Sequence, residues 1–189
     1  MGAQDSKLFV ISGPSGAGKG TLVTRGRKRR SNLGLTVSAT TRAPRKGEVD
    51  GVNYFFLTRE EFDRRVANGE FVEWAEVHGN CYGTLVSEVQ SKLASGSSLI
   101  LEIDVQGALQ VKERFPEAVL IFIKPPSLEV LRERLVGRGT ETPETIELRM
   151  ANAADELALA DRYDDVVVND DLDRATDELV RVLDMHERI

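Results

Sequence analysis

Residues 13–21 of the chain read Gly13-Pro14-Ser15-Gly16-Ala17-Gly18-Lys19-Gly20-Thr21. This turn follows the apolar run 8–11, which predicts a buried strand, and it precedes a candidate helix. Glycines in such a turn let backbone N–H groups point inward around phosphate oxygens, and the helix N-terminus adds positive potential. The turn is therefore predicted to be a phosphate-binding loop in which Lys19 supplies a point charge at the β- and γ-phosphates.

Three more apolar runs lie between helical patterns further along the chain. They cover residues 99–101 with Ile103, residues 119–123 and residues 166–168, each bounded by polar or turn residues. Strands that alternate with helices favour a parallel sheet with helices on its faces. The sequence therefore predicts an α/β fold whose first strand leads into the phosphate-binding loop.

Two segments interrupt this alternation. Residues 36–84 contain glycines between β-leaning stretches, which indicates a small mixed insertion that can move as a unit. The β-leaning stretches are residues 36–41, 54–57 and 71–77. Residues 137–147 are polar and offer no apolar anchors, so we expect a mobile lid there rather than packed core.

The composition is that of an ordinary globular domain of 189 residues with 41% hydrophobic side chains. Its formal net charge of -6 argues against a surface that binds nucleic acid as a whole, so no nucleic-acid partner is expected. The longest apolar run, 118–123, is far shorter than the roughly 20 residues of a membrane helix, so no membrane association is expected. The single cysteine, Cys81, favours a reducing, cytoplasmic location.

The candidate helix after the loop has an unusual composition. Its basic stretch, residues 25–30, is expected to form a solvated helix face rather than a nucleic-acid contact. Few apolar residues follow Val23, and Gly26 weakens the helix further. We therefore expect a short or frayed helix and a local loss of stability near the loop.

A second motif lies at residues 40–48, which read Thr-Thr-Arg-Ala-Pro-Arg-Lys-Gly-Glu. Together with the glycine-rich loop, this motif makes the chain resemble the guanylate kinases, a family of P-loop nucleoside monophosphate kinases. The resemblance covers nearly the whole chain. It continues through Gly51, Tyr54-Phe-Phe, Glu73-Trp-Ala-Glu76, Gly79-Asn80-Cys81-Tyr82-Gly83-Thr84, Glu102-Ile-Asp104-Val-Gln106-Gly107, Arg134, Gly137-Arg138-Gly139, Arg149 and Val168-Asn169-Asp170.

The resemblance implies one domain with three functional parts. A P-loop NTPase core, a parallel sheet flanked by helices, is expected at about 1–35, 85–136 and 160–189. A small mixed insertion that binds GMP is expected at about 36–84, and a mobile lid at about 137–159. The implied reaction is ATP + GMP giving ADP + GDP, by an enzyme that is a monomer or a homodimer.

On the ATP side, the resemblance implies that residues 13–21 bind the phosphates and that Asn169 lies close to the adenine. The position after the loop lysine usually carries a Ser or Thr that binds magnesium. Here that position is Gly20, and the hydroxyl follows one residue later on Thr21. We therefore expect Mg²⁺, the implied cofactor, to be held through water and the nucleotide phosphates, with Thr21 and Asp104 as candidates for contact through water.

On the GMP side, two arginines stand three residues apart in a Pro/Gly-rich turn. Arg42 and Arg45 suit forked recognition of a doubly charged phosphate, and Tyr54 and Tyr82 add hydroxyl donors. An arginine pair in a turn is, by itself, more often solvated surface, so the family motif carries this assignment. The resemblance implies that these four side chains, with Glu48 of the same motif, bind the phosphate end of GMP.

Guanine presents N1–H and N2–H₂ donors beside an O6 acceptor, which a carboxylate and hydroxyl groups match. The resemblance places Glu73 as the carboxylate and Ser38 and Thr84 as the hydroxyls. Glu102 and Asp104 end a hydrophobic strand at the edge where ligands bind in open α/β sheets. They resemble a Walker B position and are expected near GMP or the magnesium-bound phosphates.

Phosphoryl transfer spreads negative charge over the equatorial oxygens, so catalysis consists mainly of positioning and cationic stabilisation. Arginines from the lid side are the natural source of that charge, with Arg149 expected where the helix beyond the polar stretch begins. The residues expected to be catalytic are Lys19, Arg42, Arg134, Arg138 and Arg149.

Two other functions stay open on the sequence alone. A kinase of the same fold that acts on AMP or another monophosphate shares the Gly-Lys-Gly-Thr loop, but the 40–48 motif and Glu73 argue against it. A catalytically silent interaction module of similar fold typically lacks an intact phosphate-binding loop, and Lys19 with its glycines argues against that alternative.

Overall fold

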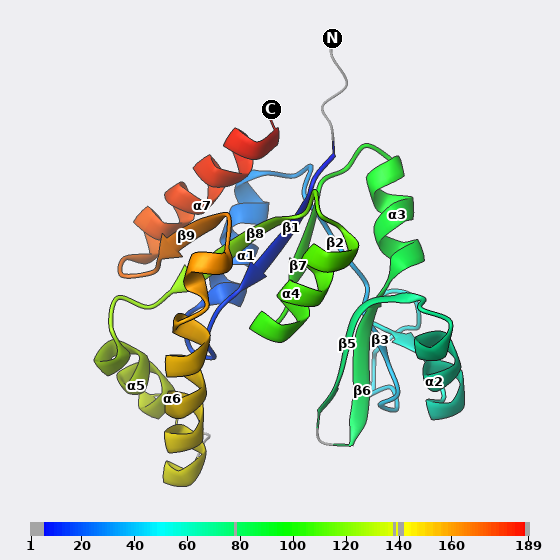
Figure 1. Cartoon of the computed structure of the whole chain (residues 1–189), viewed down its shortest axis with the longest axis horizontal. Helices are drawn as coiled ribbons and strands as arrows, with labels where there is room; N and C mark the ends of the chain where they lie inside the picture. The colour runs from blue at the N-terminus through cyan, green and yellow to red at the C-terminus, as the bar shows by residue number, and fades with distance from the viewer. Residues whose placement is uncertain (1–5, 78, 138, 140–141, 188–189) are drawn as a thin grey trace.

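Five parallel strands form the main sheet of the protein (Figure 1). The computed structural model of the chain describes residues 6–77, 79–137, 139 and 142–187. The strand order is β2-β7-β1-β8-β9, with the bounds β1 Leu8–Ser12, β2 Gly34–Leu35, β7 Leu99–Glu102, β8 Val119–Lys124 and β9 Asp165–Val168. The four apolar runs predicted as strands are confirmed. The sequence does not predict β2, because two residues carry no periodic signal.

Alternate residues of β1 face opposite sides of the sheet, as the period of a strand requires. Phe9 and Ile11 pack with α1 (Lys19–Arg29) and α7 (Leu172–Glu187), whereas Leu8 and Val10 pack with α3 (Val86–Ala94) and α4 (Val105–Arg114). The expected α/β class is therefore confirmed, with helices on both faces of the sheet. This packing places the start of the glycine-rich loop at the carboxyl edge of the central strand.

The helix α1 is neither short nor frayed, which corrects the expectation from its composition. It runs for 11 residues and buries Leu22, Val23 and Gly26. Its basic residues find partners on α7: Arg25 pairs with Asp173, Arg29 with Asp177, and Arg30 with Asp184 and Glu187. Arg30 is only 11% exposed, so the reading of this stretch as a solvated face is wrong for that residue. The partners lie on the last helix, where no local pattern reveals them.

The insertion has a sheet of its own, in the strand order β4-β3-β6-β5. The bounds are β3 Ala39–Thr40, β4 Phe55–Phe56, β5 Phe71–Val77 and β6 Asn80–Leu85, with α2 at Arg59–Ala67. The sequence does not predict β6, because Gly79 and Gly83 read as breaks. Gly83 in fact lies within the strand, where a Cβ atom would come 2.7 Å from the Glu73 carbonyl oxygen. A bulge in the pairing of β5 with β6 brings the two backbones this close.

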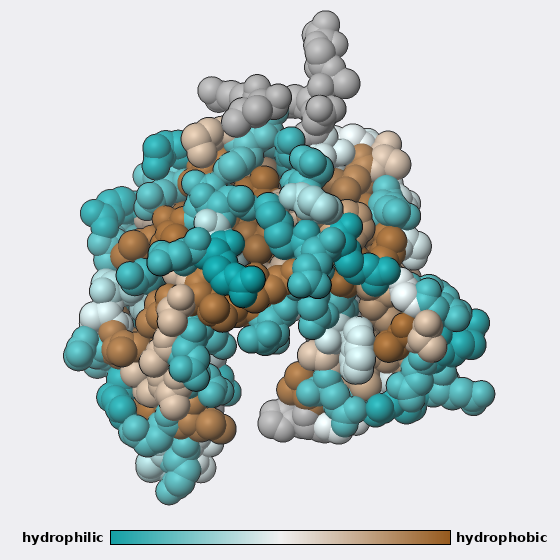
Figure 2. Space-filling view, viewed as in Figure 1, coloured by the Kyte–Doolittle hydropathy of each residue, from teal (hydrophilic) through white to brown (hydrophobic). Residues whose placement is uncertain are grey.

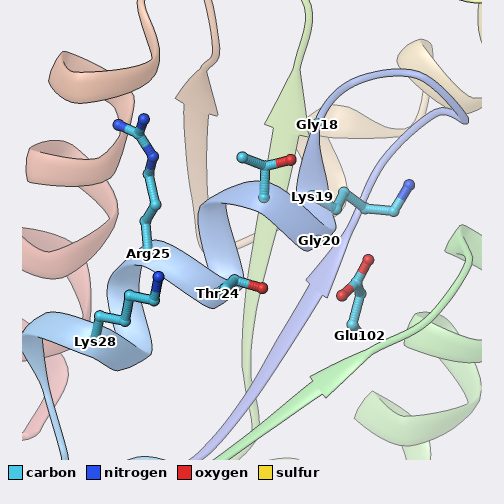
Figure 3. A pocket seen from close by; sticks show the side chains of 8 residues that line it. Gly18, Lys19, Gly20, Thr24, Arg25, Lys28 and Glu102 are labelled. Carbon is cyan, nitrogen blue, oxygen red and sulfur yellow. The ribbon is translucent and has the colours of Figure 1, made fainter. Parts of the chain in front are cut away.

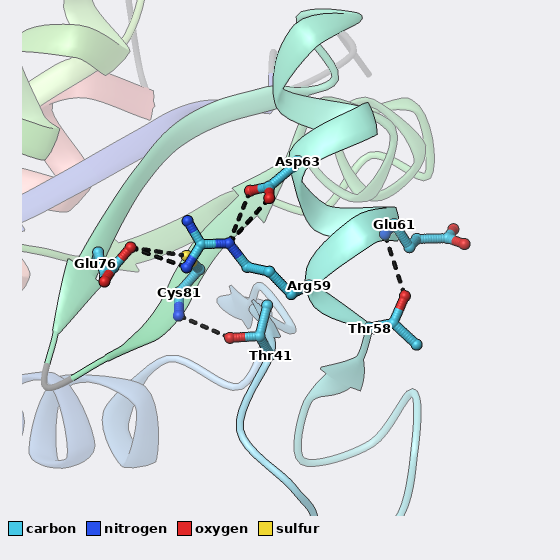
Figure 4. A network of polar contacts seen from close by, with 7 residues as sticks. All are labelled: Thr41, Thr58, Arg59, Glu61, Asp63, Glu76 and Cys81. Atoms are coloured by element: carbon cyan, nitrogen blue, oxygen red, sulfur yellow. Dashed lines mark hydrogen bonds and ion pairs between the residues drawn. The ribbon is translucent and has the colours of Figure 1, made fainter.

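Polar contacts tie α2 to the sheet of the insertion (Figure 4). The Arg59 guanidinium bonds both carboxylate oxygens of Asp63 at 3.0 Å and reaches Glu76 of β5 at 3.0 Å. Thr58 caps the helix by accepting the Glu61 N–H at 3.1 Å. Beneath them, Phe62, Phe71, Cys81 and Leu85 form a separate apolar core. The insertion is thus a small body with its own packing, as the sequence predicts.

The helices α5 (Leu128–Gly137) and α6 (Pro143–Leu157) pack on each other and face the insertion across an open cleft below the carboxyl edge of the main sheet (Figures 1 and 2). Leu131, Leu135 and Ile146 are buried between them. Ile146 corrects the expectation that residues 137–147 offer no apolar anchor. Arg149 lies in the interior of α6 rather than at its start. In the described part of the chain, no helix combines the length and apolar composition needed to cross a membrane.

Candidate active site

The glycine-rich loop connects β1 to α1 and wraps around the Lys19 side chain. Lys19 Nζ donates to the carbonyl oxygens of Gly13 at 2.6 Å and Pro14 at 3.1 Å. Gly13 has φ 140°, and a Cβ atom there would lie 2.3 Å from the Ile123 carbonyl oxygen. Glycine is therefore required for the loop to pass this close to β8. The lysine ammonium is held over the loop, which is where the predicted phosphate charges would lie.

A cavity of about 670 Å³ opens beside this loop (Figure 3). Three cationic side chains and one carboxylate contribute to its walls. Its lining consists of Gly18, Lys19, Gly20, Thr21, Thr24, Arg25, Lys28 and Glu102. The surplus of positive charge makes the cavity suited to an anionic ligand.

Gly20 and Glu102 lie next to each other in the wall of this cavity. A Cβ atom on Gly20 would lie 3.4 Å from Glu102 Oε1, so a larger side chain would enter the space that the carboxylate occupies. Partial burial raises the pKa of the Glu102 carboxyl group, and the positive charge of Lys19 opposes that rise. The glycine that follows the loop lysine thus leaves room for this carboxylate.

Asn169, at the end of β9, supports the loop from behind. Its Nδ2 donates to the Ala17 carbonyl oxygen at 2.7 Å, and its side chain would meet a Cβ atom on Gly18 at 2.3 Å. Arg134 Nη2 donates to the Asn169 carbonyl oxygen at 2.8 Å, and Arg149 Nη1 donates to Ser15 Oγ. Two of the three predicted lid arginines therefore border the loop. The third, Arg138, lies outside the described residues.

The residues expected at the GMP phosphate form one cluster in the insertion. Glu48 accepts a hydrogen bond from Arg42 Nη2 at 2.8 Å and another from the Arg45 backbone N–H at 2.6 Å. The Arg42 guanidinium lies 5.4 Å from the centre of the Tyr54 ring, and the Tyr54 and Tyr82 ring centres are 6.3 Å apart. Arg42 lowers the pKa of the Glu48 carboxyl group, so this carboxylate is charged and holds both arginine segments together.

Glu73 and Thr84, two of the residues expected at the guanine base, meet in the insertion next to α4. Thr84 Oγ1 donates to Glu73 Oε1 at 2.8 Å, and burial raises the pKa of the Glu73 carboxyl group. Asp104 caps α4 by accepting the Gly107 N–H at 2.7 Å. A Cβ atom on Gly107 would lie 3.5 Å from Glu73 Oε2, so Glu73 rests against the first turn of α4. Ser38 lies on the neighbouring strands, where its carbonyl oxygen accepts the Phe55 N–H at 2.9 Å.

The glycine-rich loop with Lys19, the Arg42–Glu48 pair and the Glu73–Thr84 pair are the groups to set beside known proteins. The family model described as guanylate kinase matches residues 5–186. The chain belongs to the guanylate kinase family. It is 52% identical over 183 residues to a guanylate kinase of Halalkalibacterium halodurans, covering 97% of this chain and 90% of the relative. It is 56% identical over 178 residues to a guanylate kinase of Gloeobacter violaceus, covering 94% and 87%.

A solved structure supports the same family at the level of the fold. The crystal structure of guanylate kinase from Anaplasma phagocytophilum matches 96% of this chain and 86% of its own, with a TM-score of 0.72 and 37% sequence identity. The match spans the P-loop core, the insertion and the α5–α6 pair. It confirms the predicted P-loop kinase fold.

The structure separates two acids that the sequence treated as one motif. Glu102 borders the loop lysine of this guanylate kinase family member, whereas Asp104 caps α4 beside Glu73. Ile103 lies between them, and its N–H bonds the Ile11 carbonyl oxygen of β1 at 3.2 Å. One acid therefore lies by the loop lysine and the other by Glu73.

Sequence analysis overlooked Glu156 on α6. It is half-buried, burial raises the pKa of its carboxyl group, and its strongest charge neighbour is Lys19, with Asp104 next. Its spacing of seven residues from Arg149 places both side chains on one face of a helix, and Arg149 contacts the loop. That spacing is the sequence signal that points to Glu156. Across the described ranges, His, Cys, Asp and Glu side chains form no group of three that could hold a metal ion.

Proposed function

We propose a role for each site residue of this chain in the reaction of its family, the ATP-dependent phosphorylation of GMP to GDP. The observation that carries the proposal is that the loop with Lys19 follows β1, while Glu73, paired with Thr84, rests against the first turn of α4, the helix that follows the neighbouring strand β7. The loop has the chemistry for a polyphosphate, and the Glu73–Thr84 pair has the chemistry for guanine.

On the ATP side, the backbone N–H groups of residues 15–21 bind the phosphates of ATP, and Lys19 leaves its loop carbonyls to contact the β- and γ-oxygens. Arg134 and Arg149 border the loop and supply positive charge to the phosphoryl group during its transfer. The part of the chain at about 137–159 is proposed to close over ATP as a lid, bringing the α6 arginine further over the phosphates.

Magnesium would reach this site with ATP. Glu102 and Thr21 border the cavity and offer oxygen atoms, which Mg²⁺ binds directly or through its water shell. Gly20 leaves the space that the longer carboxylate of Glu102 needs. When bound, the ion would neutralise charge on the β- and γ-phosphate oxygens. Among the acids at this edge, Glu102 fits that role better than Asp104, whose Oδ1 caps α4.

On the GMP side, Arg42, Arg45, Tyr54 and Tyr82 bind the phosphate, with Glu48 orienting the two arginine segments. Ionised Glu73 accepts the guanine N1–H and N2–H₂ groups. The hydroxyls of Ser38 and Thr84 complete the base pocket.

The attacking phosphate oxygen of GMP is already anionic, so no protein base is required. Closure of the insertion at about 36–84 brings it in line with ATP and excludes water, which suppresses ATP hydrolysis.

The experiment that tests this proposal follows ADP and the nucleoside diphosphate formed from ATP and magnesium with GMP, AMP, UMP or no acceptor. We expect ADP and GDP in equal amounts, a preference for GMP by orders of magnitude, and little turnover without an acceptor. A preference for AMP or UMP would contradict the roles given to Glu73 and Arg42. ATP binding without turnover on any acceptor would instead favour a catalytically silent interaction module.

A further inference from the structure

Arg114, the last residue of α4, joins the core of the protein to the insertion. Its Nη2 donates to the Gly69 carbonyl oxygen at 2.6 Å, and its Nη1 donates to the Phe71 carbonyl oxygen. Gly69 lies on the turn that leads from α2 into β5, and Phe71 is the first residue of β5. One guanidinium therefore holds two carbonyl groups of the insertion with charge-assisted hydrogen bonds.

The strand β5 is also where apolar packing passes from the insertion to the core. Phe71 packs in the core of the insertion, against Phe62 at a ring-centre distance of 4.3 Å. The next residue, Val72, packs instead in the cluster of the main sheet, together with Val105 and Val111 of α4. Successive side chains of one strand thus belong to two different bodies. The first residues of β5 are fixed to α4.

Glu73 follows directly in this anchored part of β5. Its carboxylate lies against the other end of α4, where a Cβ atom on Gly107 would approach Glu73 Oε2 to 3.5 Å. Arg114 and Gly107 lie toward opposite ends of the same helix, so α4 contacts both the start of β5 and Glu73 itself. The position of this carboxylate is therefore set by the core helix and not only by the insertion.

The residues proposed to bind the GMP phosphate are attached to the core differently. Arg42 follows β3, and Tyr54 precedes β4 at the far edge of the strand order β4-β3-β6-β5. The strand that touches the core, β5, is at the opposite edge of that sheet. A movement of the insertion pivoting at β5 shifts the phosphate cluster by more than it shifts Glu73.

We propose that Arg114 is a positioning residue for guanine recognition, which ties the start of β5 to α4 so that Glu73 keeps its place while the outer strands move. Arg114 acts through Glu73 and does not itself contact the nucleotide. The inference rests on the proposed function, since it assumes that Glu73 reads guanine. It adds that discrimination between bases depends on a residue at the remote end of a core helix.

The test compares Arg114→Ala, Arg114→Lys and, as a matched control, Glu113→Ala, an exposed neighbour on the same helix end. Each variant is assayed with GMP and with IMP, which lacks the 2-amino group that Glu73 accepts. We expect Arg114→Ala to lower the ratio of kcat/KM for GMP over IMP about fivefold to tenfold through a raised KM for GMP, with the KM for ATP unchanged. Arg114→Lys retains one donor group and is expected to fall between the alanine variant and the wild type, while Glu113→Ala matches the wild type.

An equal loss on GMP and IMP, or an unchanged ratio, would overturn the inference. Inactivity of the wild-type protein with GMP would instead defeat the proposed function, so the two failures are distinct. If the alanine variant folds poorly, hydrogen exchange in Arg114→Lys decides. The inference requires faster exchange of the amides at residues 71–74 than in the wild type, with residues 121–123 unchanged, and equal exchange would refute it.

Discussion

The side-chain amide of Asn169 donates a hydrogen bond of 2.7 Å to the Ala17 carbonyl oxygen, so the end of the last parallel strand holds the middle of the phosphate-binding loop. Asn169 is 5% exposed, so its amide is shielded from solvent. This contact fixes the loop to the end of β9, the strand at one edge of the main sheet.

We expect Asn169→Ala to weaken ATP binding about tenfold and to lower the free energy of unfolding by about 1–3 kcal/mol, because it leaves a buried carbonyl group unpaired. Titration calorimetry with ATP and denaturant unfolding measure the two effects. Asp170→Ala removes an exposed neighbour whose ion pair with Arg174 is on the surface, and it should change neither quantity appreciably. Equal effects of the two substitutions would contradict the supporting role of Asn169.

The ionised Glu73 carboxylate is proposed to bind guanine, but its buried charge lowers the stability of the folded protein. Burial raises the pKa of its carboxyl group in the folded protein, so its contribution to stability is present below the ordinary pKa and is lost as pH rises through the raised value. Glu73→Gln keeps an acceptor for the Thr84 hydroxyl and removes the buried charge. We expect this variant to be more stable than the wild type at neutral pH, to lose that advantage at acidic pH, and to lose its preference for GMP.

Chemical denaturation at neutral and acidic pH, together with kinetics on GMP, checks this prediction. In the wild type, turnover of GMP should decline on the acid side as Glu73 becomes protonated, at a pH above the ordinary value for a glutamate. If Glu73→Gln is less stable than the wild type at neutral pH, contacts other than Thr84 offset the cost of burying the Glu73 charge.

Glu48 orients Arg42 and the Arg45 backbone in the absence of GMP. Glu48→Gln keeps the size of the side chain and removes the charge that holds the guanidinium, so we expect the KM for GMP to rise about tenfold with little change in the KM for ATP. Glu60→Gln, an exposed acid on α2, is the matched control. A larger effect on ATP than on GMP would place Glu48 outside the phosphate cluster.

Gly26 is the weak point of α1, and the space around it can accept a methyl group. A Cβ atom there would lie 3.6 Å from Leu179 Cδ2, an ordinary contact distance. We expect Gly26→Ala to raise the free energy of unfolding by about 0.5–1 kcal/mol. Gly96→Ala provides the contrast, since φ is 81° at that residue and alanine there should cost about 1 kcal/mol. Thermal melts of both variants measure the effects, and a destabilised Gly26→Ala would show that α1 and α7 cannot separate to admit the methyl group.

The sequence predicts those parts of the fold whose signal is local. The strands β1, β7, β8 and β9 are apolar runs, and the loop between β1 and α1 is a dense motif, so both are identified correctly. The strands β3, β4 and β5 lie within the predicted β-leaning stretches 36–41, 54–57 and 71–77, whereas β2 has two residues, which is too short for any periodicity. The sequence does not predict β6, because Gly83 reads as a break. In the structure Gly83 lies within the strand and lets two backbones approach each other.

The candidate site was predictable as a set of residues but not as an arrangement. The motif spacings identify Glu102 and Asp104 as one acidic pair, yet Glu102 lies by Lys19 and Asp104 by Glu73. Likewise, the sequence predicts Asn169 near adenine, and it does not reveal that the Asn169 amide holds the loop. Such directions depend on contacts between residues far apart in the chain, which no local pattern contains.

The pairing of α1 with α7 has a consequence for how the protein is made. Arg25, Arg29 and Arg30 rely on acids that are synthesised about 150 residues later, and Gly26 and Leu22 pack beside Leu179 of the same final helix. A nascent chain that has emerged without its last helix has the whole nucleotide-binding motif but lacks the surface that holds the helix behind it. The phosphate-binding loop thus leaves the ribosome well before the helix that supports α1.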